Sequence, residues 1–175
     1  DGAEVYSIMR QLSAQIPGTA IPLGYDQTLR TVWQSHIPGE PFLWETLEAS
    51  QIPKTFRGIA KAVAKFHSCT VRTDRRFDLP DIDESLVDTI ATARQVYPDI
   101  EGRVTSLVSA LLAQRRSMGW PETLITPIHR DLKMRNFLIE GERIALIDMD
   151  CVCLGDPLSD LGSLIANFYL NGIRA

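Results

Sequence analysis

The residues best suited to chemistry lie between Ile128 and Leu164. There His129-Arg130-Asp131 is followed five residues later by Asn136, and a strand then ends in Ile147-Asp148. Phosphoryl transfer needs a carboxylate that accepts the proton of the attacking hydroxyl, and it needs an amide oxygen and a second carboxylate that hold magnesium ions at the phosphates. Asp131 suits the first task, and Asn136 and Asp148 suit the second. The segment therefore predicts phosphoryl-transfer chemistry.

The spacing of these residues has a mechanical reason. A loop that carries Asp131 and Asn136 must fold back so that both side chains point at one phosphate, and a hairpin over residues 137–147 then returns Asp148 to the same place. H-R-D alone is a weak signal, whereas H-x-D-x-x-x-x-N, a hairpin, I-D and G-D-P-x-x-D-L in register form a strong one. Because an unpaired carboxylate at the end of an apolar strand is unfavourable, a metal gives Asp148 a reason to be there.

These motifs together resemble the catalytic core of the aminoglycoside phosphotransferase family, which shares the protein-kinase fold and includes kinases of choline and sugars. Gly155 to Leu161 matches the G-D-P-x-x-D-L signature of that family, Arg30 to Gly39 resembles its hinge strand, and Phe56 to His67 resembles its helix ending in Leu-His. The resemblance implies ATP and Mg²⁺ as cofactors. It implies that the acceptor is a hydroxyl group of an aminoglycoside-, choline- or sugar-like small molecule.

Other residues of the motifs are expected to support the site. By the resemblance, His129 packs beneath the catalytic loop and hydrogen-bonds to backbone. Asp160, at the start of the last helix, is expected to accept backbone N–H bonds from that loop, and Asp156 belongs to the same signature. The family usually has glycine where this chain has Arg130. Lys133 either contacts the γ-phosphate, as the matching lysine does in protein kinases, or is a solvated loop lysine.

The nucleotide is expected at the hinge strand, because clefts between lobes are the usual sites for cofactors. Backbone groups around Ser35, His36 and Ile37 are predicted to bind the adenine, with Gln34 just inside. Glu4 resembles the helix glutamate that pairs in kinases with a strand lysine at the phosphates. Since the chain begins at that helix, we expect the native protein to extend further at its N terminus, and also at its C terminus.

Two other functions fit parts of the pattern. The main alternative is a kinase-like protein that binds nucleotide or a partner without catalysis, although intact Asp131, Asn136 and Asp148 argue against it. A protein kinase is disfavoured because Asp148 and Asp156 are only eight positions apart, which is too close for an activation segment. Asp150 places a second carboxylate near the predicted metal site, where it either binds metal or faces solvent.

The order of the predicted elements is a helix, two strands, several helices, a hairpin and a last helix, which is an α+β arrangement. It fits a protein-kinase-like fold with part of an N-terminal lobe and hinge strand at residues 1–38 and a mostly helical catalytic lobe at residues 39–175. The predicted helices cover residues 4–15, 42–49, 54–69, 84–96, 102–118 and 158–169, and the predicted strands cover residues 20–25, 29–37, 123–128, 137–139 and 143–147.

Composition and charge narrow the class of protein. With 175 residues, of which 45% are hydrophobic, the chain can bury a core. Its net charge of −4 gives no basis for binding nucleic acid or an anionic membrane, and no apolar stretch is long enough to span a bilayer. Cys151 and Cys153 are too close together for an ordinary disulfide or zinc framework, which favours a reducing compartment. We therefore expect a cytoplasmic protein without nucleic-acid or membrane partners; nothing in the sequence indicates an oligomeric state.

Overall fold

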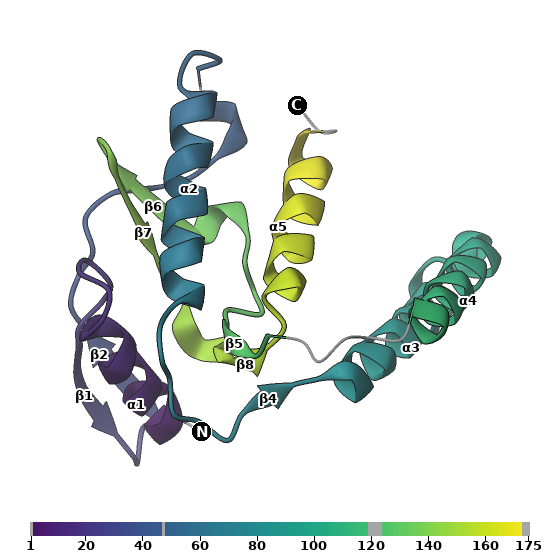
Figure 1. Ribbon diagram of the computed structural model, residues 1–175, viewed down its shortest axis with the longest axis horizontal. Coiled ribbons are helices and arrows are strands. Elements are labelled where there is room, and N and C mark those ends of the chain that lie inside the picture. Colours follow the sequence, from purple (N-terminus) through teal and green to yellow (C-terminus); the bar gives the residue numbers. More distant parts are fainter. Residues whose placement is uncertain (1, 47, 119–123, 173–175) are drawn as a thin grey trace. The chain divides into compact units, whose positions relative to one another are not determined.

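The computed structural model describes residues 2–46, 48–118 and 124–172. The chain forms two compact units, of which the first comprises residues 1–76 and 125–175 and the second comprises residues 77–124. Helices and small sheets are mixed in the first unit (Figure 1), in agreement with the predicted α+β class. All residues that the sequence predicts for the site belong to this unit. A boundary between lobes at residues 38–39 stays a prediction.

The elements are named in chain order. Those of the first unit are α1 (Gly2–Ser13), β1 (Pro22–Asp26), β2 (Thr31–Gln34), β3 (Glu40–Pro41), η1 (Trp44–Thr46), α2 (Ile52–His67), β5 (Thr126–Ile128), η3 (Met134–Asn136), β6 (Phe137–Glu140), β7 (Arg143–Leu146), η4 (Met149–Cys151), β8 (Cys153–Gly155) and α5 (Pro157–Gly172). Strand β4 (Arg76–Phe77) stands where the chain passes into the second unit, whose elements are α3 (Leu79–Val96), η2 (Pro98–Ile100) and α4 (Glu101–Met118).

Helix α1 is amphipathic and lies beside the antiparallel pair β1–β2 (Figure 1). Its residues Ile8, Met9 and Leu12 recur at helical spacing, and this spacing is why the sequence predicts the helix. All three are buried in the structure. Two glutamines on α1 tie it to the segment after α2. Gln11 exchanges two hydrogen bonds with the backbone of Arg72, at 3.2 and 2.7 Å. Gln15 does the same with the backbone of Thr70, at 2.8 and 2.9 Å.

The predicted hairpin is present as β6 and β7, with Phe137 opposite Leu146. Strand β3 pairs with the free edge of β6, so that the sheet order is β3–β6–β7. Helix α2 packs beside β7 (Figure 1). Gly39 makes the pairing of β3 possible, because its φ is +126° and a Cβ at its position would lie 3.0 Å from the carbonyl oxygen of Ile139. A side chain there would be strained by the backbone angle and crowded by backbone atoms.

The core of the first unit is shared by its helices, the hairpin and the predicted catalytic loop, which comprises residues 129–136 between β5 and β6. Phe42 and Phe66 are each 1% exposed, and Phe137 is fully buried. The ring of Phe42 meets those of Phe56 and Phe168 edge-on, with centroids 6.4 and 6.2 Å apart. These aromatic contacts join α2 and α5 to the sheet, so that the loop between β5 and β6 rests on a packed base.

The second unit is a pair of helices connected by η2. Helix α3 begins where the N–H of Asp78 donates to Asp81 Oδ2 at 2.7 Å. Arg94 Nε donates to Glu101 Oε1 at 2.8 Å, and an ion pair joins Arg115 to Asp83. The whole predicted range of both helices is confirmed, and α3 begins five residues earlier than predicted, at Leu79. Among the described helices, none is both long and apolar enough to cross a membrane.

The helix predicted at residues 42–49 is wrong. Only Trp44–Thr46 form a short 3₁₀-helix, and residue 47 lies outside the described residues. The N–H of Phe42 donates to the carbonyl oxygen of Phe137 at 2.8 Å, so this segment continues the pairing of β3 with β6 before it turns. The predicted strand at residues 123–128 starts at Thr126 in the structure, and residue 123 lies outside the described residues.

Candidate active site

The catalytic loop follows β5 and is held by one carboxylate, that of Asp160 on α5. The backbone N–H of His129 donates to Asp160 Oδ2 at 2.7 Å, and the N–H of Arg130 donates to Oδ1 at 2.9 Å. Asp160 is fully buried, and His67 Nε2 lies 2.9 Å from its Oδ2. Because a buried carboxylate needs donors on its oxygens, these contacts lock the loop and the helix together. The bonds expected between Asp160 and the loop are present.

Arg130 has an unusual backbone conformation. Its φ of +65° lies in the left-handed region, where a residue other than glycine is disfavoured by about 1–2 kcal/mol. The resembled family usually has glycine at this position, which adopts such a conformation without strain. Arg130 therefore keeps the shape of the loop at the expense of backbone strain.

His129 lies beneath the loop and is fully buried. Its Nε2 is 2.8 Å from the carbonyl oxygen of Ile147, the residue before Asp148, and its ring centroid is 6.1 Å from that of Phe66. Its Nδ1 is buried without a hydrogen-bond partner among the described residues. Because a carbonyl oxygen only accepts hydrogen bonds, Nε2 is the donor in this contact. His129 thus connects the loop to the strand end that carries Asp148.

Asn136 joins the two halves of the predicted site. Its Nδ2 donates to the backbone carbonyl of Asp131 at 2.9 Å and to Asp148 Oδ2 at 3.4 Å. The carbonyl oxygen of Asn136 in turn accepts the N–H of Ile147 at 2.9 Å. Asn136 is only 4% exposed, so its amide is fixed by these contacts. The three residues that the sequence singles out are therefore brought together in one place.

Asp148 also has a left-handed backbone, with φ +67° and ψ 60°, immediately before η4. Aspartate tolerates this region better than most residues do, but such outliers persist only where the surroundings hold them. Here His129 and Asn136 both fix the preceding residue, Ile147. The side chain of Asp148 emerges at the surface beside the buried Asn136. Asp150, two residues further on, is exposed, and its backbone carbonyl accepts a bond from Arg75 Nη1 at 2.8 Å.

Lys133 forms an ion pair with Asp131 through Oδ2 of the carboxylate. The two side chains are 32% and 42% exposed, so the pair faces solvent at the open side of the loop. Among the described residues, no hydrogen bond uses the other oxygen of Asp131, Oδ1. Lys133 is thus directed at Asp131 in this structure, and a contact with the γ-phosphate stays a prediction.

The hinge segment has one backbone donor already in use. The N–H of Ser35 donates to the carbonyl of Ile21 at 2.8 Å, and the Ser35 hydroxyl accepts the N–H of Ile21 at 2.9 Å. The Ser35 amide is therefore not available to a base in this conformation. No hydrogen bond between described residues engages the backbone of His36 or Ile37. Gln34 lines a small pocket together with Asp148, and its contact with the nucleotide stays a prediction.

Two further predicted residues have local partners. Glu4 accepts a hydrogen bond from the hydroxyl of Thr73, and no ion pair between described residues involves it. Asp156 caps α5, because its Oδ1 accepts the N–H of Leu158 at 2.9 Å and Pro157 occupies the first helical position. The cofactor role of Glu4 stays a prediction.

The oxygens of Asn136 and Asp148 suit magnesium. Because Nδ2 of Asn136 is the bonded end of its amide, the carbonyl end, Oδ1, is left as a ligand oxygen beside the carboxylate. Magnesium is usually held by one or two protein oxygens and completed by phosphates and water. The described residues contain no cluster of three or more His, Cys, Asp and Glu that could hold a metal.

Two residues of the site were not recognised from the sequence. His67 was assigned no role in the site from the sequence, but it contacts the carboxylate that holds the loop. Asn167 on α5 accepts the N–H of Met134 at 3.0 Å through its side chain, and so supports the loop a few residues after Asp131. Both lie far along the chain from the residues they support, and no local pattern marks them.

The fold is shared with solved small-molecule kinases. An aminoglycoside phosphotransferase from Streptomyces rimosus, solved with ADP and streptomycin, has a TM-score of 0.65 at 20% identity over 97% of this chain and 68% of that one. A choline/ethanolamine kinase family protein from Mesorhizobium loti has a TM-score of 0.61 at 21% identity over 99% of this chain and 57% of that one. A thermostable mutant of another aminoglycoside phosphotransferase, solved with ADP and hygromycin B, has a TM-score of 0.67 at 15% identity over 93% and 59%.

At such identities these likenesses show the fold alone. This chain spans between 57% and 68% of the length of those three proteins. A comparison with curated proteins found no match. The model of the phosphotransferase enzyme family, in contrast, matches residues 2–173, which is nearly the whole chain. With its catalytic loop, its hairpin and its capped last helix in the expected places, the chain belongs to the phosphotransferase enzyme family.

Proposed function

We propose that the protein transfers the γ-phosphoryl group of ATP to a hydroxyl group of an aminoglycoside-, choline- or sugar-like small molecule. The observation that carries the proposal is the amide of Asn136, which bonds both to the loop at Asp131 and to the carboxylate of Asp148. The base and the metal-binding carboxylate of phosphoryl transfer must lie side by side, and here one buried side chain joins them.

In this proposal Asp131 is the general base. Its Oδ2 is held by Lys133, and its Oδ1 is left to accept the proton of the acceptor hydroxyl. Lys133 brings a positive charge to the place where the transferred phosphoryl group gains negative charge. Asn136 Oδ1 and Asp148 would hold Mg²⁺, which, when bound, neutralises charge on the phosphate oxygens.

The nucleotide base would lie against the hinge, bonded by the backbone of His36 and Ile37, with Gln34 inside. The solved relatives with ADP support a nucleotide in this fold, and their streptomycin and hygromycin B complexes support a polar, hydroxyl-rich acceptor. In phosphoryl transfer the protein mainly positions the reactants and stabilises charge, and it takes little part in covalent chemistry.

The test is Asp131→Asn, assayed for phosphoryl transfer from ATP in the presence of Mg²⁺ over a panel of aminoglycosides, choline and sugars. We expect kcat to fall by roughly 10²- to 10⁴-fold while ADP affinity changes by less than about twofold, because a base acts in the transition state. Asp74→Asn, which removes an exposed carboxylate elsewhere on the same unit, is the matched control and should leave kcat unchanged.

Asp148→Ala separates the metal from the base. It should abolish the Mg²⁺ dependence of ADP binding measured by calorimetry, which Asp131→Asn should preserve. A wild-type protein that binds ADP but turns over no acceptor in the panel would favour the alternative, a kinase-like protein without catalysis. Unchanged turnover in Asp131→Asn would remove Asp131 from the mechanism.

A further inference from the structure

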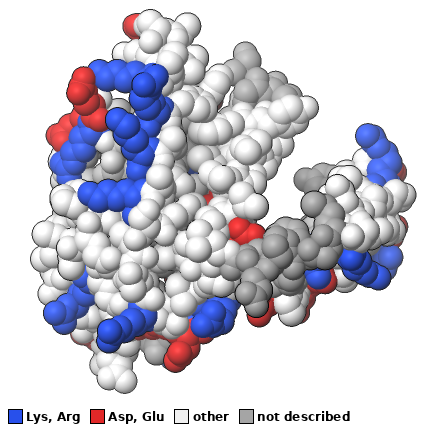
Figure 2. Space-filling view, in the orientation of Figure 1, with Lys and Arg blue, Asp and Glu red and all other residues white. Residues whose placement is uncertain are grey.

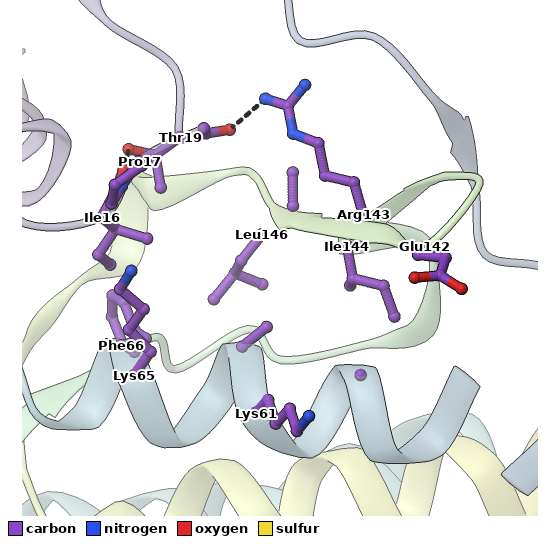
Figure 3. A pocket seen from close by; sticks show the side chains of 14 residues that line it. Ile16, Pro17, Thr19, Lys61, Lys65, Phe66, Glu142, Arg143, Ile144 and Leu146 are labelled. Atoms are coloured by element: carbon purple, nitrogen blue, oxygen red, sulfur yellow. Dashed lines mark hydrogen bonds between the residues drawn. The ribbon is translucent and has the colours of Figure 1, made fainter. Parts of the chain in front are cut away.

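A second cavity lies between α2 and the β6–β7 hairpin. It has a volume of about 320 Å³ and is enclosed by the turn after α1, by α2 and by the β6–β7 hairpin (Figure 3). This volume is in the range of small-molecule pockets, which begin at roughly 300 Å³. Its lining does not include Asp131, Asn136 or Asp148. The residues predicted for phosphoryl transfer therefore do not account for it.

The charges around this cavity are mostly positive. Lys61, Lys65 and Arg143 line it with one acidic residue, Glu142, in a chain whose net charge is −4. Arg143 is itself paired with Glu140 Oε2 at 3.3 Å. Lys and Arg side chains gather over α2 and the hairpin around a hollow in the surface (Figure 2). A basic hollow in an acidic protein attracts anions locally, whatever the net charge.

The acidic residue of the cavity is already engaged. Glu142 accepts a hydrogen bond from Lys54 Nζ at 2.6 Å, and this bond holds the pKa of the Glu142 carboxyl below its ordinary value. Of the four lysines, Lys54 and Lys133 have ion pairs with carboxylates. Within the described part of the chain, Lys61 and Lys65 have no ion pair. The two lysines without a counter-charge are thus the two that line the cavity.

The two lysines lie on the same face of α2. They are one helical turn apart on α2, a spacing that puts side chains about 5–6 Å from each other at Cβ. Arg143 is fixed at the rim, because its Nη2 donates to the carbonyl of Gly18 at 3.2 Å. Gly18 permits this approach, since its φ is +92° and a Cβ there would lie 2.8 Å from Arg143 Nη2.

The floor of the cavity is apolar. Ile144 and Leu146 point from β7 toward α2, where Phe66 closes the other side (Figure 3). Phe66 and Leu146 are only 1% and 5% exposed. Gly58 also lines the cavity, and the absence of a side chain there leaves room for the end of Ile144. A charged rim over an apolar floor matches a ligand with an anionic head and a compact apolar body.

We propose that this cavity binds a small organic anion, with its phosphate or carboxylate group between Lys61 and Lys65 and its apolar part against Ile144, Leu146 and Phe66. The site is separate from the nucleotide site and does not depend on the proposed catalytic function. It shares the wall residues Thr19 and Leu146 with the small pocket that Gln34 and Asp148 line.

The test uses the full chain and 1-naphthyl phosphate as the probe, followed by its fluorescence anisotropy. Lys61→Gln/Lys65→Gln should weaken binding by about three- to tenfold, because each exposed ion pair contributes up to a few-fold in affinity. Arg57→Gln/Arg103→Gln is the matched control: it removes the same charge from two exposed residues outside the cavity, and should change the affinity by less than about twofold. Inorganic phosphate should bind more weakly than the probe, since it has no apolar part.

Saturating ADP with Mg²⁺ distinguishes this site from the nucleotide site. We expect the probe to stay bound under ADP, and we expect ADP affinity to be the same in wild type and in the lysine double variant. Three results would overturn the proposal: no saturable binding to wild type, equal loss in the lysine and arginine double variants, or displacement of the probe by ADP. Equal affinity for inorganic phosphate and the probe would overturn the apolar half of it.

Discussion

Asp160→Asn changes one atom at the point where α5 holds the catalytic loop. Asp160 accepts from the N–H of His129 and the side chain of His67 through Oδ2, and from the N–H of Arg130 through Oδ1. An asparagine has one acceptor oxygen. In its better orientation it keeps His129 and His67 and turns its NH₂ toward the N–H of Arg130, so that two donors face each other in a buried place.

The expected loss of stability follows from these contacts. One hydrogen bond to a charged group is removed, which costs about 1.5–3 kcal/mol, and the bonds that remain lose the charge of their acceptor. We therefore expect Asp160→Asn to lower the free energy of unfolding by about 2–4 kcal/mol, a large part of the roughly 5–15 kcal/mol typical of a domain.

Asp156→Asn is the matched control, because it is the same substitution four residues away. Asp156 caps α5, and asparagine caps helices about as well as aspartate does, so its effect should stay within about 0.5 kcal/mol. Urea unfolding at pH 7 compares the two variants. Amide hydrogen exchange reports on the loop itself, and protection should fall at His129 and Arg130 in Asp160→Asn alone. If both variants unfolded at the wild-type midpoint, or if exchange at these amides did not change, the carboxylate would not be what fixes the loop.

Three other substitutions and treatments probe single features of the fold. At position 130, the Arg130→Gly variant should be more stable than the Arg130→Val variant by about 1–2 kcal/mol in urea unfolding. Both variants lose the arginine side chain, and only valine is strained by a φ of +65°. Equal stabilities of the two variants would contradict the strain. Gly39→Ala should lower the free energy of unfolding by about 1–3 kcal/mol, whereas Gly162→Ala, in open space on α5, should raise it by up to about 1 kcal/mol. A Gly39→Ala variant more stable than the Gly162→Ala variant would refute the close approach of β3 to β6. Burial, opposed in part by Lys65, raises the pKa of the Cys69 thiol. Iodoacetamide at pH 8 should therefore modify Cys69 more slowly than the exposed Cys151, and the difference between the two rates should narrow as pH rises. Peptide mass spectrometry measures both rates, and faster labelling of Cys69 would contradict the prediction.

The part of the site that could be predicted is the part that chemistry ties to a fixed spacing. Asp131, Asn136 and Asp148 are joined by a short loop and a hairpin, and local patterns predict both of these well. The helices with a clear apolar stripe were also predictable, as α1 and α2 illustrate.

What could not be predicted depends on contacts between distant segments. The pairing of β3 with β6 and the bond from Phe42 to Phe137 override a helical pattern at residues 42–49, because a partner strand nearly a hundred residues away satisfies the backbone. His67 meets Asp160 across 93 positions of sequence. The basic cavity is made of three segments whose proximity no single pattern contains.

Arg130 shows how the loop keeps its shape without the glycine that the family resemblance leads one to expect there. A left-handed arginine is disfavoured by about 1–2 kcal/mol, yet the same backbone angle helps to present two successive amides to the two oxygens of Asp160. Bonds to a charged acceptor contribute about 1.5–3 kcal/mol each, which exceeds that strain. Asp148 repeats the arrangement, since its left-handed backbone follows a residue fixed by His129 and Asn136. Both strained residues thus adjoin the predicted base or bind the predicted metal, and both are held by the buried polar groups beneath them, so the integrity of that network sets the geometry of the site.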